Sequence, residues 1–278
     1  MNTTDRDTFI ASHTFAASTR ASYARAITAL LADYPEPETL TAIQLVKWIE
    51  KPHWGSSHRY VTLTAIQSFL RWKFGPTHAA LAARTKRTGS GRKKRSLTQA
   101  QVNTLLASFD RFTKKGARDL AIASLAIDTG LRLAELCNLR DADTDTALCE
   151  CFVTIKGGAD GRGVFSQETA LHLEHWRAMR GQATETLFCS TASGAKRYGQ
   201  KLSREGLQTI VKKWGAALGI KLSPHDFRRT YTRLSLKNGA PTRTVQLGGR
   251  WSNIAMVELY SKDMEQDEIR RFLPIHNL

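Results

Sequence analysis

The sequence predicts a mainly α-helical protein with a small antiparallel β-sheet, divided into two domains by a basic linker. Apolar residues recur at helical spacing over most of the chain. Residues 151–155 alternate as a short strand does, and a glycine-rich turn and the pair Val164-Phe165 follow as a return strand. Residues 84–95 contain seven basic residues and no large apolar side chain, so they cannot form a core. We therefore expect a first domain over residues 1–83, a linker over residues 84–95 and a second domain over residues 96–278.

The first domain is expected to be a small helical unit. Its helices are predicted over residues 19–34, over residues 39–51 and from Ser56 onward. Prolines follow the first two helices and end them, and Ser56-Ser57 can cap the third.

The second domain begins with Thr98, a candidate cap for a helix that contains Val102 and Leu105. A strongly apolar helix around residues 120–127 follows and stops at Asp128-Thr129-Gly130. The remaining helices are expected over residues 131–139, 169–179, 204–218, 224–237, 242–247 and 253–260.

The charge balance points to a polyanionic partner. The chain has 41 Lys and Arg against 25 Asp and Glu, which gives a formal net charge of +16 and a pI near 10.0. Such a surplus attracts polyanions and favours release of their condensed counterions. Nucleic acid is the expected partner, because no isolated basic amphipathic helix supports a membrane surface. No apolar run approaches the ~20 residues of a membrane span, and the first residues lack the pattern of a signal peptide.

The cysteines and histidines do not predict a metal site. The four cysteines form no CxxC pair, so we expect reduced thiols in a cytoplasmic protein. His172 and His175 could share a metal on one helix face, but no third ligand lies near them in the sequence, and surface histidines are the simpler interpretation. Asp141, Asp143 and Asp145 are interpreted as turn residues, and no cofactor is expected.

The chemistry is suggested by a group of cationic residues and one phenol. Breaking a phosphodiester requires positive charge on the non-bridging oxygens, a proton for the leaving alkoxide and an in-line nucleophile. Arg132 and Arg228 can grip phosphate oxygens with two donors each. His225 and Lys156 are further cation-capable groups, and the phenol of Tyr260 could attack the phosphorus.

Three motifs in order carry a resemblance to a known family. Gly130-Leu131-Arg132-Leu133-Ala134-Glu135-Leu136 resembles the first arginine motif of the tyrosine recombinases, which include Cre, the Xer proteins and the phage integrases. His225-Asp226-Phe227-Arg228 resembles their His-x-x-Arg motif, and the segment from Leu247 to Tyr260 resembles the segment that carries their nucleophile. The resemblance spans residues 97–260 and implies a helical core-binding domain plus a tyrosine-recombinase catalytic domain with the DNA breaking-rejoining enzyme fold.

The resemblance implies a role for each matching residue. Tyr260 would be the nucleophile that forms a 3′-phosphotyrosyl bond and releases a 5′-hydroxyl. Arg132, Arg228 and His225 would surround the scissile phosphate. Lys156, on the turn between two strands, would protonate the leaving oxygen, with Arg162 as the alternative cation nearby.

Two further residues complete the expected catalytic set. Glu135 lies one turn after Arg132 and would orient Arg132 or His225. Trp251 stands where most of the family has histidine, nine residues before Tyr260, and its indole offers one N–H donor to a phosphate oxygen but cannot shuttle a proton. Tyr231 is a rival phenol that we expect to pack inside its helix, and Tyr198 lies in a basic stretch that could touch DNA.

The resemblance also implies the activity and the partners. It implies a site-specific recombinase that acts on double-stranded DNA with inverted-repeat core sites, through a Holliday junction and without metal or ATP. Four protomers would assemble on two duplexes, with the apolar tail of residues 261–278 docked in a neighbouring subunit; the alternative is a tail folded onto its own domain. The early first helix leaves no room for an additional N-terminal arm-binding module. The DNA contacts expected from the first domain and the linker are Arg59, Arg84, Lys86, Arg87, Arg92, Lys93, Lys94 and Arg95.

Two other activities remain open at this point. A type IB topoisomerase has similar catalytic residues and would relax supercoiled DNA as a monomer. A DNA-binding regulator descended from a recombinase would bind without cleavage, although no catalytic residue is missing from this sequence. Neither the target site nor the use of accessory DNA-bending proteins follows from the sequence.

Overall fold

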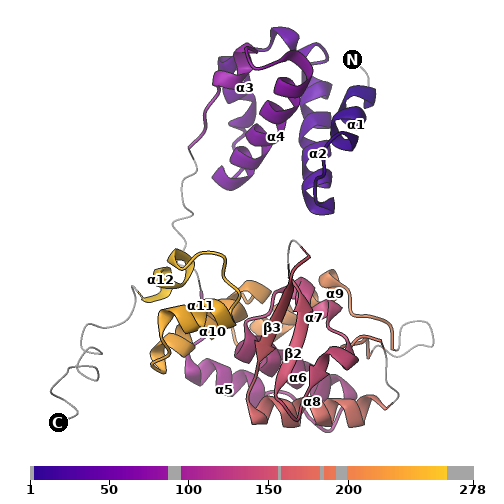
Figure 1. Cartoon of the computed structure of the whole chain (residues 1–278), viewed down its shortest axis with the longest axis vertical. Coiled ribbons are helices and arrows are strands. Elements are labelled where there is room, and N and C mark those ends of the chain that lie inside the picture. The colour runs from indigo at the N-terminus through magenta and orange to yellow at the C-terminus, as the bar shows by residue number, and fades with distance from the viewer. Residues whose placement is uncertain (1–2, 87–94, 156–157, 182–184, 192–198, 262–278) are drawn as a thin grey trace, which may run out of the picture. The chain divides into compact units, whose positions relative to one another are not determined.

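The chain forms two compact units, which we describe separately. Contacts divide it into Met1–Lys93 and Lys94–Leu278. The structure is a computed structural model, and it describes residues 3–86, 95–155, 158–181, 185–191 and 199–261 (Figure 1). Within these residues the chain is mainly helical with one small antiparallel sheet, as the sequence predicts.

The first unit packs its helices around an apolar core. Its buried side chains include Ile27, Leu45, Ile66 and Phe69. The helix expected over residues 39–51 is shorter, because a 3-10 turn precedes it and Thr41 caps it with Gln44 in a capping box. The expected cap by Ser56-Ser57 is wrong, since the helix already begins at Ser56 and Gly55 is its N-cap. The elements are α1 (Thr3–Ala11), α2 (Ala17–Asp33), η1 (Pro37–Thr39), α3 (Ala42–Ile49), α4 (Ser56–Phe74) and η2 (Ala79–Ala82).

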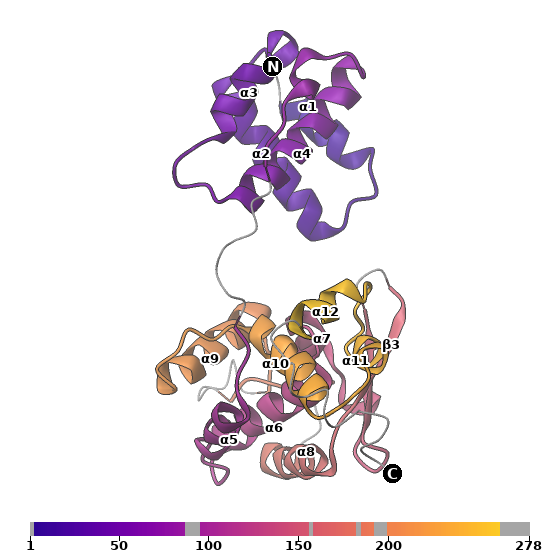
Figure 2. The same cartoon turned by 90° about the vertical axis from the view of Figure 1, so that its left-hand side faces the viewer.

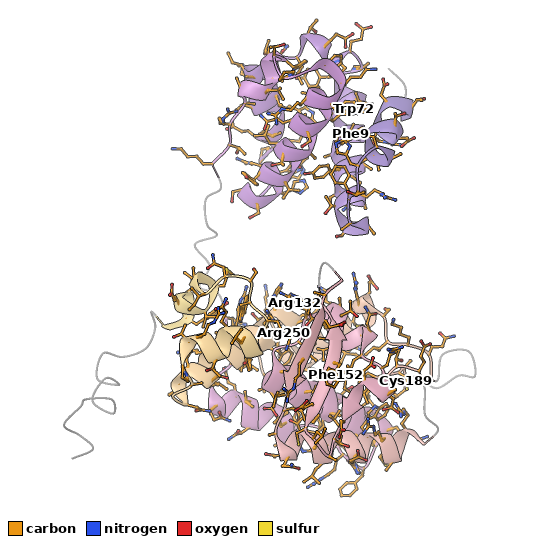
Figure 3. All side chains as sticks on the ribbon, viewed as in Figure 1. Phe9, Trp72, Arg132, Phe152, Cys189 and Arg250 are labelled. Carbon is orange, nitrogen blue, oxygen red and sulfur yellow. The ribbon has the colours of Figure 1, made fainter. Side chains whose placement is uncertain are left out.

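The sequence analysis missed helix α1. The segment has few large apolar residues, so it shows no helical stripe. Tertiary packing holds it instead: the ring of Phe9 lies 5.7 Å from that of Phe69 and 5.6 Å from that of Trp72. Figure 3 shows Phe9 and Trp72 side by side.

The second unit is built around helix α6, which is buried along most of its length. Helix α8 packs against α6, and the core includes Trp176, Phe188 and Phe227. The capping role predicted for Thr98 is confirmed, in a capping box with Gln101. The helices are α5 (Gln99–Ala107), α6 (Lys114–Thr129), α7 (Leu133–Asn138), η3 (Asp141–Asp143), α8 (Gln167–Arg180), α9 (Arg204–Ala217), α10 (Pro224–Lys237), α11 (Thr242–Gly248) and α12 (Ala255–Ser261).

The sheet has the order β1-β2-β3 and is antiparallel throughout. Its strands are β1 (Thr144–Asp145), β2 (Glu150–Thr154) and β3 (Asp160–Val164). The return strand therefore begins earlier than Val164, where the sequence analysis placed its start. The glycines that suggested a longer turn lie inside β3, where a Cβ on Gly161 would meet the Arg250 side chain and one on Gly163 would meet Cys151.

Helices α10, α11 and α12 pack against one another, and α11 also contacts β3 (Figures 1 and 2). They enclose a small apolar cluster of Leu236, Val245, Val257 and Tyr260. These three helices and the turns between them carry two of the three motifs. The first motif lies at the junction of α6 and α7, against which α10 also packs.

The structure also bears on the cysteines, on metal-binding groups and on membrane-spanning helices. All four cysteines are buried. Within the described ranges, no His, Cys, Asp or Glu group could hold a metal ion. No helix in that part of the chain has the length and apolarity needed to cross a membrane.

Candidate active site

Arg132 is held by a carboxylate at the start of α7. It is the N-cap residue, and its backbone N–H donates to Glu135 Oε2 at 2.9 Å. Its guanidinium also donates, from Nη1 to Glu135 Oε1 at 2.7 Å. Glu135 is buried, so this pair fixes both the backbone and the side chain of Arg132.

Arg228 meets Arg132 at a single oxygen atom. Arg228 is 1% exposed and donates from Nη1 to the Gly130 carbonyl at 2.7 Å. Its Nη2 donates to the carbonyl of Arg250 at 3.2 Å, and Arg132 Nη2 donates to the same carbonyl at 3.4 Å. Figure 3 shows Arg132 and Arg250 next to each other between the strands and the C-terminal helices. Two guanidinium groups therefore converge on one oxygen.

The site concentrates positive charge in a poorly solvated place. Burial lowers the pKa of Arg228 to about 9, and the neighbouring charges of Arg132 and Arg250 add to this effect. Burial also lowers the pKa of Arg250, although Glu135 opposes it. Arg228 remains charged at neutral pH. An anion entering this region would relieve the repulsion among these groups.

Trp251 lies against the arginine pair by its ring face. Arg228 Cζ is 4.0 Å from the centroid of the Trp251 ring, a cation–π contact. The indole Nε1 donates to Thr232 Oγ1 at 3.2 Å. In this arrangement the indole N–H, which the sequence analysis assigned to a phosphate oxygen, is used within the protein.

Tyr260 is tucked into the apolar cluster of the C-terminal helices. It is 8% exposed, and its ring centroid lies 6.5 Å from that of Trp251. Burial raises the pKa of the Tyr260 phenol, while the charge of Arg229 and a hydrogen bond with it act in the opposite direction. The phenol is therefore protonated at neutral pH.

His225 is in the first turn of α10, on the exposed side. Ser223 caps this helix in a capping box with Asp226, and Pro224 follows as its first residue. Desolvation, then Arg229 and Arg228, hold the pKa of His225 below its ordinary value. The imidazole is neutral at pH 7.

The structure brings most of the expected set together. Arg132, Glu135, Arg228 and Trp251 are linked through Arg250, and Tyr260 lies against Trp251. Lys156 falls between β2 and β3 in the sequence but lies outside the described residues. Tyr231 packs against Gly130 and Gly248, inside the unit.

The structure describes some of the first-unit and linker residues that were expected to contact DNA. Arg59 is half-buried and donates from Nη2 to the Lys51 carbonyl at 3.1 Å, so its guanidinium is engaged within its own unit. Arg84, Lys86 and Arg95 are exposed. Arg87, Arg92, Lys93 and Lys94, like Tyr198 in the second unit, lie outside the described residues.

Sequence reasoning missed Arg250 and Arg229. Arg250 was visible as a basic residue between two glycines and Trp251, but nothing local distinguishes it from a surface charge. Arg229 follows Arg228 directly and would be expected on another side of the helix. Only the packing of α10 against α12 brings it to the Tyr260 phenol.

A separate polar cavity lies away from the arginines. It has a volume of about 260 Å³ and lies between α5, α6, α8 and α10. Ser124 Oγ and His172 Nδ1 line it and are 2.8 Å apart. Burial lowers the pKa of His172. Its wall includes Tyr231 but none of the expected catalytic residues.

Comparison with known proteins identifies the family. The model of the phage integrase family matches residues 95–267. Tyrosine recombinase XerC of Serratia marcescens is 26% identical over 260 residues, covering 87% of this chain and 83% of the relative. Tyrosine recombinase XerA of Pyrococcus horikoshii is 24% identical over 229 residues, covering 81% and 76%.

Solved structures show the same fold. The Tn1549 transposon integrase in complex with transposon right end DNA superimposes with a TM-score of 0.77 at 13% identity, and 99% of each chain is covered. XerH bound to its palindromic difH substrate gives a TM-score of 0.72 at 13% identity, covering 93% of this chain and 80% of XerH. The family model matches more than half of the chain and contains all three motifs. The protein therefore belongs to the phage integrase family.

Proposed function

We propose that this protein is a site-specific DNA recombinase that cleaves and rejoins DNA through a covalent phosphotyrosine. The observation that carries the proposal is the convergence of Arg132 Nη2 and Arg228 Nη2 on one oxygen, at 3.4 and 3.2 Å. In this structure that oxygen is the backbone carbonyl of Arg250, so both guanidinium groups are oriented toward one acceptor and would need only a small shift to share a phosphate oxygen. The relatives named tyrosine recombinases and the DNA-bound structural neighbours support the same function.

The arginine pair would bind the phosphate and stabilise its transition state. Guanidinium groups keep their charge at working pH and donate along fixed directions, so they can follow the charge that develops on phosphorus-bound oxygens. Glu135 fixes one of them and the Gly130 carbonyl fixes the other, so the pair is preorganised. Burial strengthens both interactions because competing water is excluded.

The chemical step is an in-line displacement. Tyr260 Oη would form a bond to phosphorus while the bond from phosphorus to O5′ breaks, leaving a 3′-phosphotyrosine. His225, kept neutral by its lowered pKa, would accept the phenolic proton. Lys156 would give a proton to O5′, so a 5′-hydroxyl leaves.

Rejoining is the reverse reaction with a different strand. A 5′-hydroxyl from the partner duplex would attack the phosphotyrosine and give its proton to Lys156, while the released Tyr260 oxygen takes its proton back from His225. The energy of the phosphodiester bond stays in the intermediate, so no ATP is needed. Two sequential exchanges of this kind produce and resolve a Holliday junction.

The observed position of Tyr260 is a resting position within this proposal. Its phenol is protonated and is influenced by the nearby charge of Arg229, while the phosphate would lie at Arg132 and Arg228. DNA binding would have to move α12 so that the phenol reaches the phosphorus. The cationic neighbours would then favour the phenolate.

The remaining assignments concern partners. The first unit and the basic linker would hold the DNA, with the exposed Arg84, Lys86 and Arg95 as phosphate contacts. The tail of residues 261–278 would dock into a neighbouring protomer and assemble a tetramer on two inverted-repeat core sites.

The test is capture of the covalent intermediate. The protein is incubated with a nicked suicide DNA that carries its recombination site, and adducts are separated on a denaturing gel. The wild-type chain should form an adduct without added metal, and Tyr260→Phe should form none. Tyr231→Phe is the matched control, since it removes the rival phenol, and it should still form the adduct.

Three outcomes would contradict the proposal. An adduct in Tyr260→Phe would exclude this nucleophile. Scission that disappears with a chelator and leaves no protein on the DNA would exclude the mechanism. The topoisomerase alternative would be favoured if the monomer relaxed a plasmid of random sequence as fast as it cleaved the recombination site.

A further inference from the structure

Arg250 combines three unfavourable features in one residue. Its backbone is left-handed, with φ of 54°, a conformation that side-chain-bearing residues rarely adopt. Its guanidinium is 6% exposed, so a charge is buried. Within the described structure, its buried Nε has no hydrogen-bond partner. Such features persist where the surrounding structure enforces them, and they collect at functional sites.

The side chain of Arg250 ties its own turn to other elements. Nη1 donates to the Gly248 carbonyl at 2.8 Å and to the Arg162 carbonyl in β3 at 3.0 Å. Nη2 donates to the Thr129 carbonyl at the end of α6 at 3.0 Å and lies 3.7 Å from Glu135 Oε2. The turn before α12 is therefore joined to β3, α6 and α7.

Gly161 makes this contact possible. A Cβ at Gly161 would lie 2.7 Å from Ile155 Cγ2 and 2.9 Å from Arg250 Cδ, both closer than real Cβ atoms normally approach. The glycine in the strand thus provides space for the arginine stem. Strand β3 therefore provides both space for Arg250, at Gly161, and a hydrogen-bond acceptor, the Arg162 carbonyl.

The backbone of Arg250 faces the proposed phosphate site at the same time. Its carbonyl accepts the hydrogen bonds from Arg132 and Arg228. The next residue is Trp251, whose backbone N–H donates to the Gln246 carbonyl at 3.0 Å. A displacement of Arg250 would consequently shift the arginine pair, the Trp251 ring and the start of the segment that leads to Tyr260.

We infer that Arg250 is a positioning residue for the recombination reaction, which fixes the β2–β3 hairpin and the Gly248–Trp251 turn to each other across the arginine pair. The inference rests on the proposed function, in which Tyr260 follows the turn and the proton donor Lys156 follows β2 in the sequence. Arg250 is not itself a phosphate ligand. Its donors are directed to backbone carbonyls and its guanidinium is buried.

The experiment separates chemistry from binding and from folding. Single-turnover cleavage and DNA affinity are measured at one salt concentration for the full chain, for Arg250→Ala and for Arg250→Lys. We expect cleavage by Arg250→Ala to fall by about 100-fold, the effect of a misplacement of about 1 Å, with DNA affinity within about threefold. Arg250→Lys should recover part of the rate, because an ammonium can still reach one or two of the carbonyls.

A second substrate reports on the hairpin specifically. In DNA with a bridging sulfur at the 5′ position of the scissile phosphate, the leaving thiolate needs no proton. Lys156→Ala should therefore be rescued on this DNA, and the deficit of Arg250→Ala should shrink at least about tenfold, as misplaced proton delivery predicts. Any loss of cleavage rate that remains on this DNA would reflect displacement of the segment that carries Tyr260.

Two further variants, Arg140→Ala and Gly161→Ala, serve as controls. Arg140→Ala removes an exposed arginine that pairs with Asp143 and should leave cleavage within about twofold. Gly161→Ala keeps the charge of Arg250 but presses on both its stem and Ile155, so slower cleavage supports the inference only together with a partial loss in Arg250→Lys. This pair of variants serves if a thermal melt shows that Arg250→Ala does not fold.

The outcomes distinguish the two proposals. If the wild-type chain forms no adduct, or Lys156→Ala is not rescued by the sulfur substrate, the proposed function or its proton donor fails. If those hold while Arg250→Ala and Gly161→Ala cleave at the wild-type rate, the inference is wrong. Loss of DNA affinity in parallel with cleavage would also overturn it, because Arg250 would then act in binding.

Discussion

The two units of the molecule differ in whether they bury charged side chains. In the described part of the first unit, the buried side chains are apolar apart from Thr62. The second unit buries Arg118, Asp119, Glu135, Arg180, Asp226 and Arg228. Surface charges act through a screened field that tolerates movement, whereas buried charges act in fixed directions. Within the proposed function, the first unit would therefore supply attraction to DNA and the second would supply oriented chemistry.

The largest expected effect follows from replacing a buried guanidinium. Arg228→Lys keeps the positive charge but loses the planar fork that holds both the Gly130 and Arg250 carbonyls. We expect single-turnover cleavage to fall by about 10³-fold, as for loss of a preorganised donor, with little change in DNA affinity. The matched change Arg140→Lys, at an exposed ion pair, should be silent. Equal activity of Arg228→Lys and the wild type would remove the distinction between the units.

A core substitution tests the apolar side of the comparison. Phe69 is fully buried and packs against Phe9, so Phe69→Ala should destabilise the first unit by about 3–5 kcal/mol. Hydrogen exchange of α4 amides measures this change without requiring the whole chain to unfold in two states. The half-exposed Trp72 is the control, and Trp72→Ala should cost less. Equal losses would contradict the packing account.

Linker charges should produce a smaller, salt-dependent effect. In the double variant Arg84→Ala with Lys86→Ala, two exposed cations are removed next to the first unit. The slope of log affinity against log salt should decrease in magnitude by about 2, with little sequence dependence. DNA binding titrations at several salt concentrations measure it. An unchanged slope would show that these residues do not touch phosphates.

The smallest effect concerns pH. The pKa of His172 is lowered in the folded state, mainly by burial, so the unfolded state takes up its proton first as pH falls. Stability should therefore be complete above the unfolded pKa, about 6.5, and decrease as pH falls from there through the folded pKa. Urea unfolding between pH 7.5 and 5, with about 0.5-unit steps, measures it. His172→Gln should flatten this decrease, and an unchanged pH profile would argue against the shift.

Local signals explain what could be predicted from the sequence. Helix α10 has the bounds that were expected, because Pro224 begins it and the Ser223–Asp226 capping box fixes its start. The end of α6 before Gly130 could also be predicted, because glycine commonly ends a helix. In the structure Gly130 adopts the left-handed conformation, with φ of 57°. The motifs around Arg132 and Arg228 are short and local, so they could be recognised without a structure.

Long-range contacts explain what could not be predicted. Arg250 bonds to carbonyls 88 and 121 residues away, and no local pattern records either contact. Helix α1 depends on Phe69 and Trp72, far along the chain, for its stability. The glycines of β3 were interpreted as turn residues because a sequence does not show that Arg250 occupies the space beside Gly161.

The end of helix α6 has a consequence for the energetics of the site. Its terminal carbonyls, Thr129 and Gly130, accept hydrogen bonds from Arg250 and Arg228. The aligned peptide dipoles of this long helix place partial negative charge there. The backbone dipole thus compensates cations that would otherwise require additional carboxylates. Carboxylates would repel an incoming phosphate, whereas the helix end carries only a partial charge and is already hydrogen-bonded to the arginines.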